Sequence, residues 1–267
     1  MNAAEGIWRD IEAIRSGGPL IHNITNYVVM NTTANALLAI GASPVMAHAI
    51  EEVEEMTELA AALVINIGTL SQPWIAAMRK AAGRARQLRI PIVLDPVGAG
   101  ATRFRTETAR RLLEETPPTI LRGNASEIRA LALDEKGTKG VESRLDSTEA
   151  REAAGILASR FGCVVSVSGA VDLITDGTFA AHVANGHPLM TRVTGLGCTA
   201  SALIGAFAAV NPNPYRAATH AMAVMGIAGE IAAERAEGPA GFQVHFIDAL
   251  FKLEAGDIES RLRMEAD

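Results

Sequence analysis

The residues best suited to chemistry lie at positions 194–199 (Thr-Gly-Leu-Gly-Cys-Thr), which lead into the apolar, alanine-rich run 200–210. The glycines expose backbone N–H groups, and a helix that begins beside them leaves its first N–H groups unpaired. Such a helix start carries about half an elementary positive charge and binds anions. The same field favours the thiolate of Cys198. The segment therefore predicts an anion site with a nucleophile or base beside it. The alternative is that Cys198 is a small buried side chain at a tight helix start.

A second candidate is Asp95, which ends the apolar run 91–95 and precedes a loop containing Gly98 and Gly100. A carboxylate at a strand end, next to a glycine loop, can hold a metal ion beside a bound phosphate. The alternative is that Asp95 only caps the loop and the glycines only serve the turn.

A third candidate is Arg122 with the residues that follow it. Asn124 is a good helix N-cap, and Glu127 three residues later completes a near capping box, which is a structural role. The functional alternative is that Arg122 binds a phosphate and Glu127 orders a hydrated magnesium ion. Ser168 ends another apolar run and could contact a nucleotide phosphate, although serine before a turn is common for local reasons.

Short apolar runs alternate with helical patterns, which predicts an α/β fold with a mostly parallel sheet covered by helices on both faces. Ligands then bind beyond the carboxyl ends of the strands. The expected strands are 62–68, 91–95, 119–122 and 163–168, and the expected helices are 73–88, 104–115, 125–133 and 147–160. Residues 134–144 are expected to be a polar connector. The dipeptide Asp176-Gly177 predicts a β-hairpin between 171–175 and 178–183, and therefore an antiparallel edge. Residues 197–253 are expected to be largely helical, with breaks at 211–214 and 238–241.

Composition narrows the possible partners and compartments. The chain has 267 residues, is 49% apolar and carries a net charge of -6, with no basic stripe for a nucleic acid. Its two cysteines, Cys163 and Cys198, lack the spacing of a disulfide framework or a zinc site, which fits the cytoplasm. No leader pattern stands at the amino terminus and no apolar run is long enough to span a membrane. The motifs GxxxxGK[ST], HExxH and a GxGxxG after the first strand are absent, and the six histidines are interpreted as structural.

Together, the segments resemble the hydroxyethylthiazole kinase family of the ribokinase-like superfamily. The resemblance covers nearly the whole chain. It rests on the segments 24–29 (ITNYVV), 38–46 (LAIGASPVM), 66–70 (NIGTL), 95–101 (DPVGAGA), 122–127 (RGNASE) and 194–198 (TGLGC). It implies one three-layer α/β/α domain over residues 1–267. It also implies ATP- and Mg²⁺-dependent phosphorylation of the primary alcohol of 4-methyl-5-(2-hydroxyethyl)thiazole, in thiamine synthesis and salvage.

The resemblance also implies roles for particular residues. Cys198 is the catalytic base, at a position where relatives in the superfamily usually carry aspartate. The helix start must then favour its thiolate, unless a phosphate oxygen is the base. The anion hole consists of the N–H groups of Gly195, Leu196, Gly197 and Cys198. The thiazole contacts Asn26, Met46, Gly68 and Gly195, ATP contacts Arg122 and Ser168, and magnesium is ordered by Glu127 and Asp95. Similar enzymes are homotrimers with the thiazole site near a subunit boundary, which is expected here.

Three other functions remain possible. One is a kinase of another small alcohol, such as hydroxymethylpyrimidine, although such enzymes usually carry the aspartate that this chain lacks. Another is a nucleotide-binding regulator without catalysis, against which the joint presence of Arg122, Glu127 and the glycine turn argues. The third is a lyase acting on a nucleotide, since this fold hosts several chemistries.

Overall fold

The computed structural model describes residues 2–133 and 147–266, so the connector expected at 134–144 lies outside the described residues. The described helices are α1 (Ala3–Gly17), α2 (Met30–Ile40), α3 (Val53–Leu59), α4 (Gln72–Leu88), α5 (Arg103–Glu115), α6 (Ala125–Ala132), α7 (Ser147–Phe161), the 3-10 helix η1 (Pro188–Arg192), α8 (Leu196–Val210), α9 (Pro214–Ala233), α10 (Pro239–Lys252) and α11 (Ala255–Arg261). The described strands are β1 (Leu20–Ile24), β2 (Ser43–Val45), β3 (Ala62–Asn66), β4 (Ile92–Asp95), β5 (Ile120–Asn124), β6 (Val164–Ser168), β7 (Asp172–Thr175), β8 (Ala180–Val183) and β9 (Met264–Ala266).

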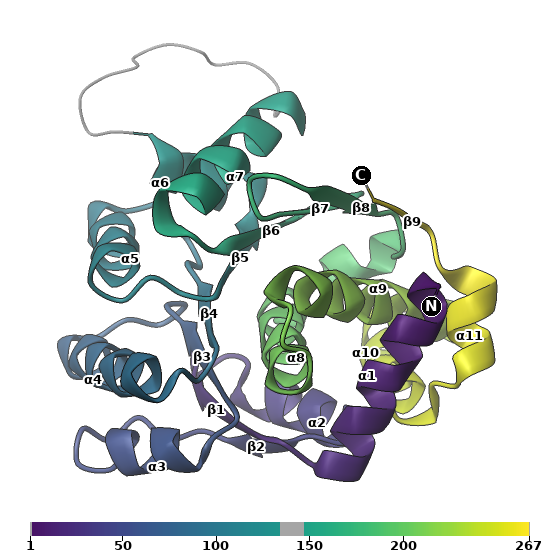
Figure 1. The fold of residues 1–267 in the computed structure, drawn as a ribbon. Coiled ribbons are helices and arrows are strands. Elements are labelled where there is room, and N and C mark those ends of the chain that lie inside the picture. The colour runs from purple at the N-terminus through teal and green to yellow at the C-terminus, as the bar shows by residue number, and fades with distance from the viewer. Residues whose placement is uncertain (1, 134–146, 267) are drawn as a thin grey trace.

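These strands form one sheet in the order β2-β1-β3-β4-β5-β6-β7-β8-β9 (Figure 1). The pairs from β2 to β6 are parallel, and the pairs from β6 to β9 are antiparallel. Gly177 has a φ of 91° in the turn between β7 and β8, where glycine avoids the steric cost of a side chain. The mostly parallel sheet and its antiparallel edge are therefore confirmed.

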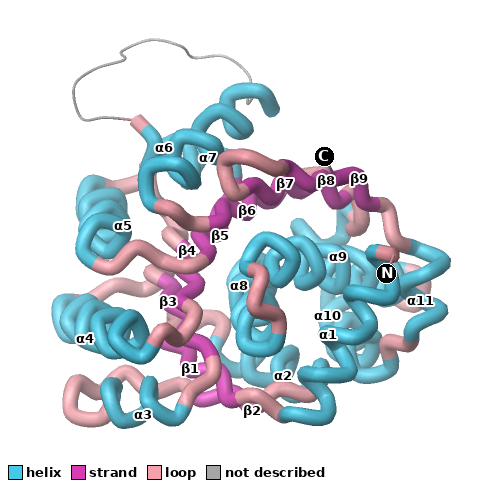
Figure 2. Tube along the Cα trace, viewed as in Figure 1, coloured by secondary structure: helices cyan, strands magenta, loops and turns pink. Residues whose placement is uncertain are grey.

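Helices cover both faces of the sheet, and Figure 2 shows the strands running between the two helical layers. On β3, Val64 packs into one apolar core with α1, α2 and α8–α11, whereas Leu63 and Ile65 pack into a second core with α3–α7. The same alternation occurs on β4, β5 and β6. Because successive side chains of a strand point to opposite faces, purely apolar strands are suited to a sheet buried on both sides. The predicted three-layer arrangement is confirmed.

Most of the expected elements agree with the structure to within two residues at each end. Strand β3 ends at Asn66 rather than at residue 68, because the Asn66 side chain accepts a hydrogen bond from the Gly68 N–H (2.9 Å) and turns the chain. The acidic run 51–55 is typical of a solvated helix face and overlaps the start of α3. The other elements before residue 62, together with η1, α11 and β9, were not predicted. None of the described helices is both long enough and apolar enough to cross a membrane.

Strands β1, β3, β4, β5 and β6 run in the same direction, so their carboxyl ends lie at one edge of the sheet. Helix α8 packs against β1, β3 and β4. Its amino-terminal turn holds Gly197 against Arg122 of β5, and its Cys198 contacts Asn26, which follows β1. This edge is where a ligand is expected in an open α/β sheet.

Candidate active site

A chain of hydrogen bonds links the ends of three neighbouring strands to Cys198. The Asn66 amide of β3 donates to Oδ2 of Asp95 on β4 (2.9 Å), and its oxygen accepts from the Asn26 amide (2.8 Å). Asn26, which follows β1, also donates to the Cys198 sulfur (3.5 Å). Since the parallel register places these residues side by side, the cluster follows directly from the strand order.

Asp95 is fully buried in this cluster. Ser201, on the first turns of α8, donates to its Oδ2 (2.7 Å), while Oδ1 is buried without a hydrogen-bond partner. Arg122 lies nearby, with Nη1 3.9 Å from Oδ2. Burial raises the pKa of Asp95 to about 6, and the Arg122 charge only partly opposes this. A carboxylate with one fixed oxygen and one unpartnered oxygen is suited to a bound cation or its water.

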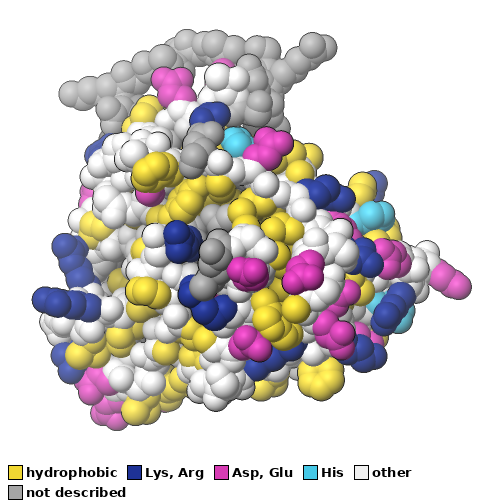
Figure 3. All heavy atoms as spheres, turned by 45° about the vertical axis from the view of Figure 1, so that its right-hand side comes forward, with side chains coloured by type: hydrophobic (Ala, Val, Ile, Leu, Met, Phe, Trp, Pro, Cys, Tyr) yellow, Lys and Arg dark blue, Asp and Glu magenta, His cyan; other side chains and the backbone are white. Residues whose placement is uncertain are grey.

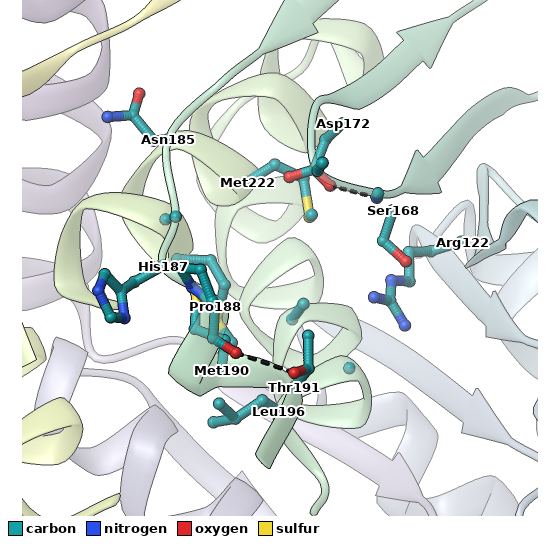
Figure 4. Close-up of a pocket in the computed structure, with 17 residues that line it drawn as sticks. Arg122, Ser168, Asp172, Asn185, His187, Pro188, Met190, Thr191, Leu196 and Met222 are labelled. Atoms are coloured by element: carbon teal, nitrogen blue, oxygen red, sulfur yellow. Dashed lines mark hydrogen bonds between the residues drawn. The ribbon is translucent and has the colours of Figure 1, made fainter. Parts of the chain in front are cut away.

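Arg122 stands between this cluster and a cavity at this edge of the sheet. The cavity has a volume of about 560 Å³ and is lined by Arg122, Ser168 and Gly197, among other residues. A Cβ on Gly197 would lie 2.9 Å from Nη1 of Arg122, so the guanidinium packs directly against the first turn of α8. Figure 4 shows Arg122 and Ser168 on one side of the cavity, opposite Pro188 and Met190. The two residues expected at ATP therefore line the same cavity.

The start of α8 lacks a side-chain cap. Its N-cap is Gly195, with a φ of 86°, and no side chain bonds the first N–H groups of this helix. A Cβ on Gly195 would lie 2.7 Å from Cγ1 of Val29, so both the backbone conformation and the available space favour glycine. By contrast, helix α6, which begins directly after β5, is capped by the side chain of Asn124. The N–H groups of α8 are thus available to an anion.

The environment of Cys198 opposes its ionisation. Burial and the nearby Asp95 charge raise the pKa of the thiol, and this outweighs the opposite effects of Asn66, Asn26 and Arg122. The expectation that the helix start favours a thiolate is therefore wrong for this structure, because desolvation is the larger effect. Both cysteines are free.

Glu127 forms the capping box of α6. Its Oε2 accepts from the Asn124 N–H (2.8 Å), while the Asn124 side chain accepts from the Glu127 N–H (3.0 Å). Its Oε1 accepts from the N–H of Gly98 in the loop after β4 (2.8 Å). The capping role is thus present, and the charge also lies close enough to Asp95 to raise the pKa of that carboxyl.

The residues expected at the thiazole lie at the same edge of the sheet. A Cβ on Gly68 would lie 2.5 Å from the Asn26 amide nitrogen, so Gly68 and Asn26 are in direct contact. Gly195 follows η1 and directly precedes α8. Met46 follows β2, one strand further out, and does not take part in the hydrogen-bonded cluster.

Comparison with known proteins identifies the family. Residues 11–256 match the model of the hydroxyethylthiazole kinase family. The chain belongs to this family. A hydroxyethylthiazole kinase of Syntrophus aciditrophicus (strain SB) is 59% identical over 263 residues, which cover 98% of this chain and 97% of that protein.

Solved structures support the same assignment. The structure of a hydroxyethylthiazole kinase protein from Pyrococcus horikoshii OT3 has a TM-score of 0.92 and 47% identity, covering 98% of this chain and 99% of that one. A ribokinase-like superfamily protein from Enterococcus faecalis V583 has a TM-score of 0.63 at 14% identity, with coverage of 89% and 88%. The fold of this hydroxyethylthiazole kinase family member is therefore ribokinase-like.

Three residues of the site in this family member were not predicted to take part. Asn66 and Ser201 hold Asp95, as described above. Arg105 of α5 donates to the carbonyl oxygens of Ile67 (3.0 Å), Val97 (2.7 Å) and Gly68 (2.7 Å), and so ties the loop after β3 to the loop after β4. Ser201 could have been found from its spacing of three residues from Cys198, which places both on one side of a helix.

Proposed function

We propose that this chain transfers the γ-phosphoryl group of ATP to the primary alcohol of 4-methyl-5-(2-hydroxyethyl)thiazole, giving the thiazole phosphate used in thiamine synthesis. The proposal rests on family membership and on one observation. The uncapped start of α8 lies between Arg122, on the cavity side, and Asn26 with Cys198, on the other side. A phosphoryl donor and an alcohol can therefore meet at one anion-binding turn.

ATP occupies the cavity of about 560 Å³, with its phosphates toward Arg122 and Ser168. Arg122 offers a planar set of donors that matches phosphate oxygens. The N–H groups of Gly195, Leu196, Gly197 and Cys198 stabilise the negative charge of the migrating group, because they are already in place before the reaction. No capping side chain forms a hydrogen bond at this helix start, which supports this role.

The thiazole rests against Asn26, Met46, Gly68 and Gly195. A flat, weakly polar ring is suited to bare glycine backbone and a thioether. Asn26 is fixed there by its hydrogen bond to Asn66, so its position does not depend on the substrate. The hydroxyethyl group points toward Cys198.

Cys198 is the proposed base that takes the proton of the alcohol. Because burial raises its pKa, only a small fraction is ionised at neutral pH, but that fraction is a correspondingly strong base. The alternative is transfer of the proton to an oxygen of the γ-phosphate. In either case, the Asn26 amide positions the sulfur through its hydrogen bond.

Magnesium fits the two carboxylates at this edge. Asp95 has a buried Oδ1 without a partner, and both Glu127 oxygens are fixed by backbone N–H groups. When bound, the ion would neutralise the negative charge of the phosphates. Within the described ranges no cluster of three or more His, Cys, Asp or Glu could hold a metal. We infer that Asp95 and Glu127 bind mainly its water shell, as is usual for Mg²⁺ beside a nucleotide.

A homotrimer with the thiazole site near a subunit boundary is part of the proposal. Tyr27 and Val28, directly after Asn26, are 66% and 63% exposed, and Val244 and Phe251 of α10 are also exposed apolar side chains. Figure 3 shows that hydrophobic side chains also reach the surface on the side that carries α1 and α11.

We further propose a single domain over residues 1–267 that works in the cytoplasm, with neither nucleic acid nor membrane as a partner, in keeping with the net charge of -6.

The test is an ATP- and Mg²⁺-dependent phosphorylation assay on a panel of small alcohols, with the product identified by mass. The thiazole alcohol should be turned over best. Turnover of hydroxymethylpyrimidine with none of the thiazole would instead assign the chain to that alcohol. Nucleotide binding without turnover of any alcohol would favour the regulator.

A further inference from the structure

We propose that this site discriminates little among the bases of purine nucleoside triphosphates, because it holds the base by apolar contact rather than by hydrogen bonds. The inference rests on the proposed role of the cavity as the nucleotide site. It concerns the part of the cavity away from Arg122 and Ser168, where the base of a nucleotide would lie if its phosphates face the start of α8. All residues that line the cavity are in the described part of the chain.

Three methionines line this part of the cavity. Met222 and Met225 lie three residues apart on α9, on the same side of the helix, and Met190 comes from η1. A Cβ on Gly229 would lie 2.5 Å from Sδ of Met190, so Met190 is packed against α9. Thioether sulfurs and methyl groups are polarisable and adapt to flat rings of different outline.

Two polar side chains of this wall, Asn185 and Thr191, donate their hydrogen bonds within the protein. The two N–H groups of the Asn185 amide go to Oε1 of Glu230 (3.1 Å) and to the carbonyl oxygen of Arg261 (2.7 Å). The Thr191 hydroxyl donates to the carbonyl oxygen of Pro188 (2.8 Å). Figure 4 shows the Asn185 and His187 side chains pointing away from the space between Met222 and Arg122.

Two backbone donors along the same wall, those of Gly186 and Met190, are also occupied. The Gly186 N–H donates to Oε1 of Glu230 (2.9 Å), and the Met190 N–H donates to the carbonyl oxygen of His187 (3.0 Å). At the opposite wall, the Gly169 N–H donates to Oδ1 of Asp172 (2.9 Å). The ring nitrogens of a purine, which are acceptors, therefore meet none of these donors.

Asp172 is the residue that could oppose this inference. It is buried and lines the cavity, and its carboxylate could accept a hydrogen bond from the 6-amino group of adenine. However, its Oδ1 already accepts a hydrogen bond from the N–H of Gly169, the residue that follows Ser168 (2.9 Å). The experiment therefore includes this residue.

The two kinds of recognition differ strongly in selectivity. A site that hydrogen-bonds a substrate group rejects an analogue without that group by about 10⁴–10⁵-fold, whereas an apolar pocket discriminates by about 10–200-fold for a methylene. Loss of the 6-amino group from the base should therefore change kcat/KM by less than about tenfold here, because no group of the protein is left unpaired.

The test uses the full wild-type chain with Mg²⁺ and saturating thiazole alcohol, and compares ATP, ITP and purine riboside triphosphate as donors. We expect the three kcat/KM values to lie within about tenfold of each other. A loss of more than 100-fold with purine riboside triphosphate would overturn the inference. A preference for ATP that is lost in Asp172→Asn would also overturn it, and would assign the amino group to Asp172.

Calorimetric affinities of the same nucleotides, measured without the alcohol, separate this inference from the proposed function. If no alcohol is phosphorylated but the nucleotides bind equally, the proposed function fails and the inference stands.

As a second check, Met225→Ala should raise the dissociation constants of all three nucleotides in parallel, by about tenfold, while Met56→Ala on the distant α3 should leave them unchanged. Weaker binding of ATP alone would contradict apolar recognition.

Discussion

The Asn26 amide donates a hydrogen bond to the Cys198 sulfur, and through this contact the loop after β1 meets the first turn of α8. Because Asn26 also donates to Asn66, which in turn donates to Asp95, a single network connects the proposed alcohol site to the proposed metal site. Substitutions of residues beside this network should therefore affect the binding of nucleotide, metal and alcohol individually.

Gly197→Ala should impair ATP binding specifically. The new Cβ would lie 2.9 Å from Nη1 of Arg122, so the guanidinium must move away from the start of α8. A displacement of about 1 Å at a phosphate contact can cost about 100-fold, and we expect KM for ATP to rise about 10–100-fold. Steady-state kinetics on both substrates would measure it.

The matched control is Gly83→Ala on α4, where a Cβ would meet nothing within 4 Å. This substitution should leave both KM values unchanged and stabilise the helix by up to about 1 kcal/mol. An unchanged KM for ATP in Gly197→Ala would show that Arg122 does not bind the phosphates in its present position.

Glu127→Gln should raise the magnesium requirement as well as weaken the cap of α6. Glutamine can present only one carbonyl oxygen, so one of the N–H groups of Gly98 and Asn124 loses its acceptor. Loss of the negative charge weakens the hold on the metal and its water. The magnesium concentration at half-maximal rate should rise several-fold in a titration at saturating ATP.

The same substitution in a capping box far from the site provides the control. Glu5 accepts from the Asn2 N–H (3.0 Å) in α1, and so forms the same capping box as Glu127. Glu5→Gln should lower the free energy of unfolding by about 1 kcal/mol or less and leave the magnesium titration unmoved. If both variants give the wild-type titration, Glu127 is a helix cap and nothing more.

Arg105→Lys should weaken binding of the alcohol. An ammonium group cannot bridge the carbonyl oxygens of Ile67, Gly68 and Val97 as the planar guanidinium does, so the loop that carries Gly68 loses its brace. We expect KM for the thiazole alcohol to rise about 3–10-fold, because a displacement of this loop by less than about 1 Å weakens its contact with the substrate. KM for ATP should change little. Arg103→Lys, in an exposed ion pair with Glu107, should change neither. Equal changes in both KM values would indicate a general loss of structure instead.

Asp10 should make folding stability fall in acid, independently of the active site. Burial alone would raise its pKa, but hydrogen bonds from His220 and Asn211 outweigh this and lower it below the usual 3.8. A lowered pKa stabilises the fold above the unfolded value, and this stabilisation is lost as pH falls through the folded value. Asp10→Asn should therefore cost about 2 kcal/mol at pH 6 and less at pH 3, by denaturant unfolding. A cost that is independent of pH would contradict this account.

The sequence predicted the part of the fold from β3 to the hairpin of β7 and β8, where apolar runs or a turn dipeptide indicate the strands. Strand β1 escaped prediction because its His22 and Asn23 are polar yet buried, where His22 bonds Thr57 and the carbonyl of Ala47. Strand β2 has only 3 residues, and one of them is proline. The sequence of β1 is therefore too polar, and that of β2 too short, to indicate a strand.

The site was predictable where a charged residue lies near the carboxyl end of an apolar strand, as at Asp95 and Arg122, or where a glycine turn precedes a helix, as at Gly195. Arg105 was not predictable, because an arginine on an amphipathic helix usually faces solvent and only the tertiary structure brings it to three carbonyl groups. The direction of the Cys198 pKa was mispredicted for a similar reason. The sequence indicates the helix start but not the extent of burial, and burial is the larger effect here.

The most direct test of the central claim is the kcat of Cys198→Ala for phosphorylation of the thiazole alcohol, measured together with ATP affinity by calorimetry. If Cys198 takes the proton at the start of α8, kcat should fall by about 10²–10⁴-fold while the dissociation constant for ATP stays within about threefold of wild type. A wild-type kcat would contradict the account and assign the proton to a phosphate oxygen.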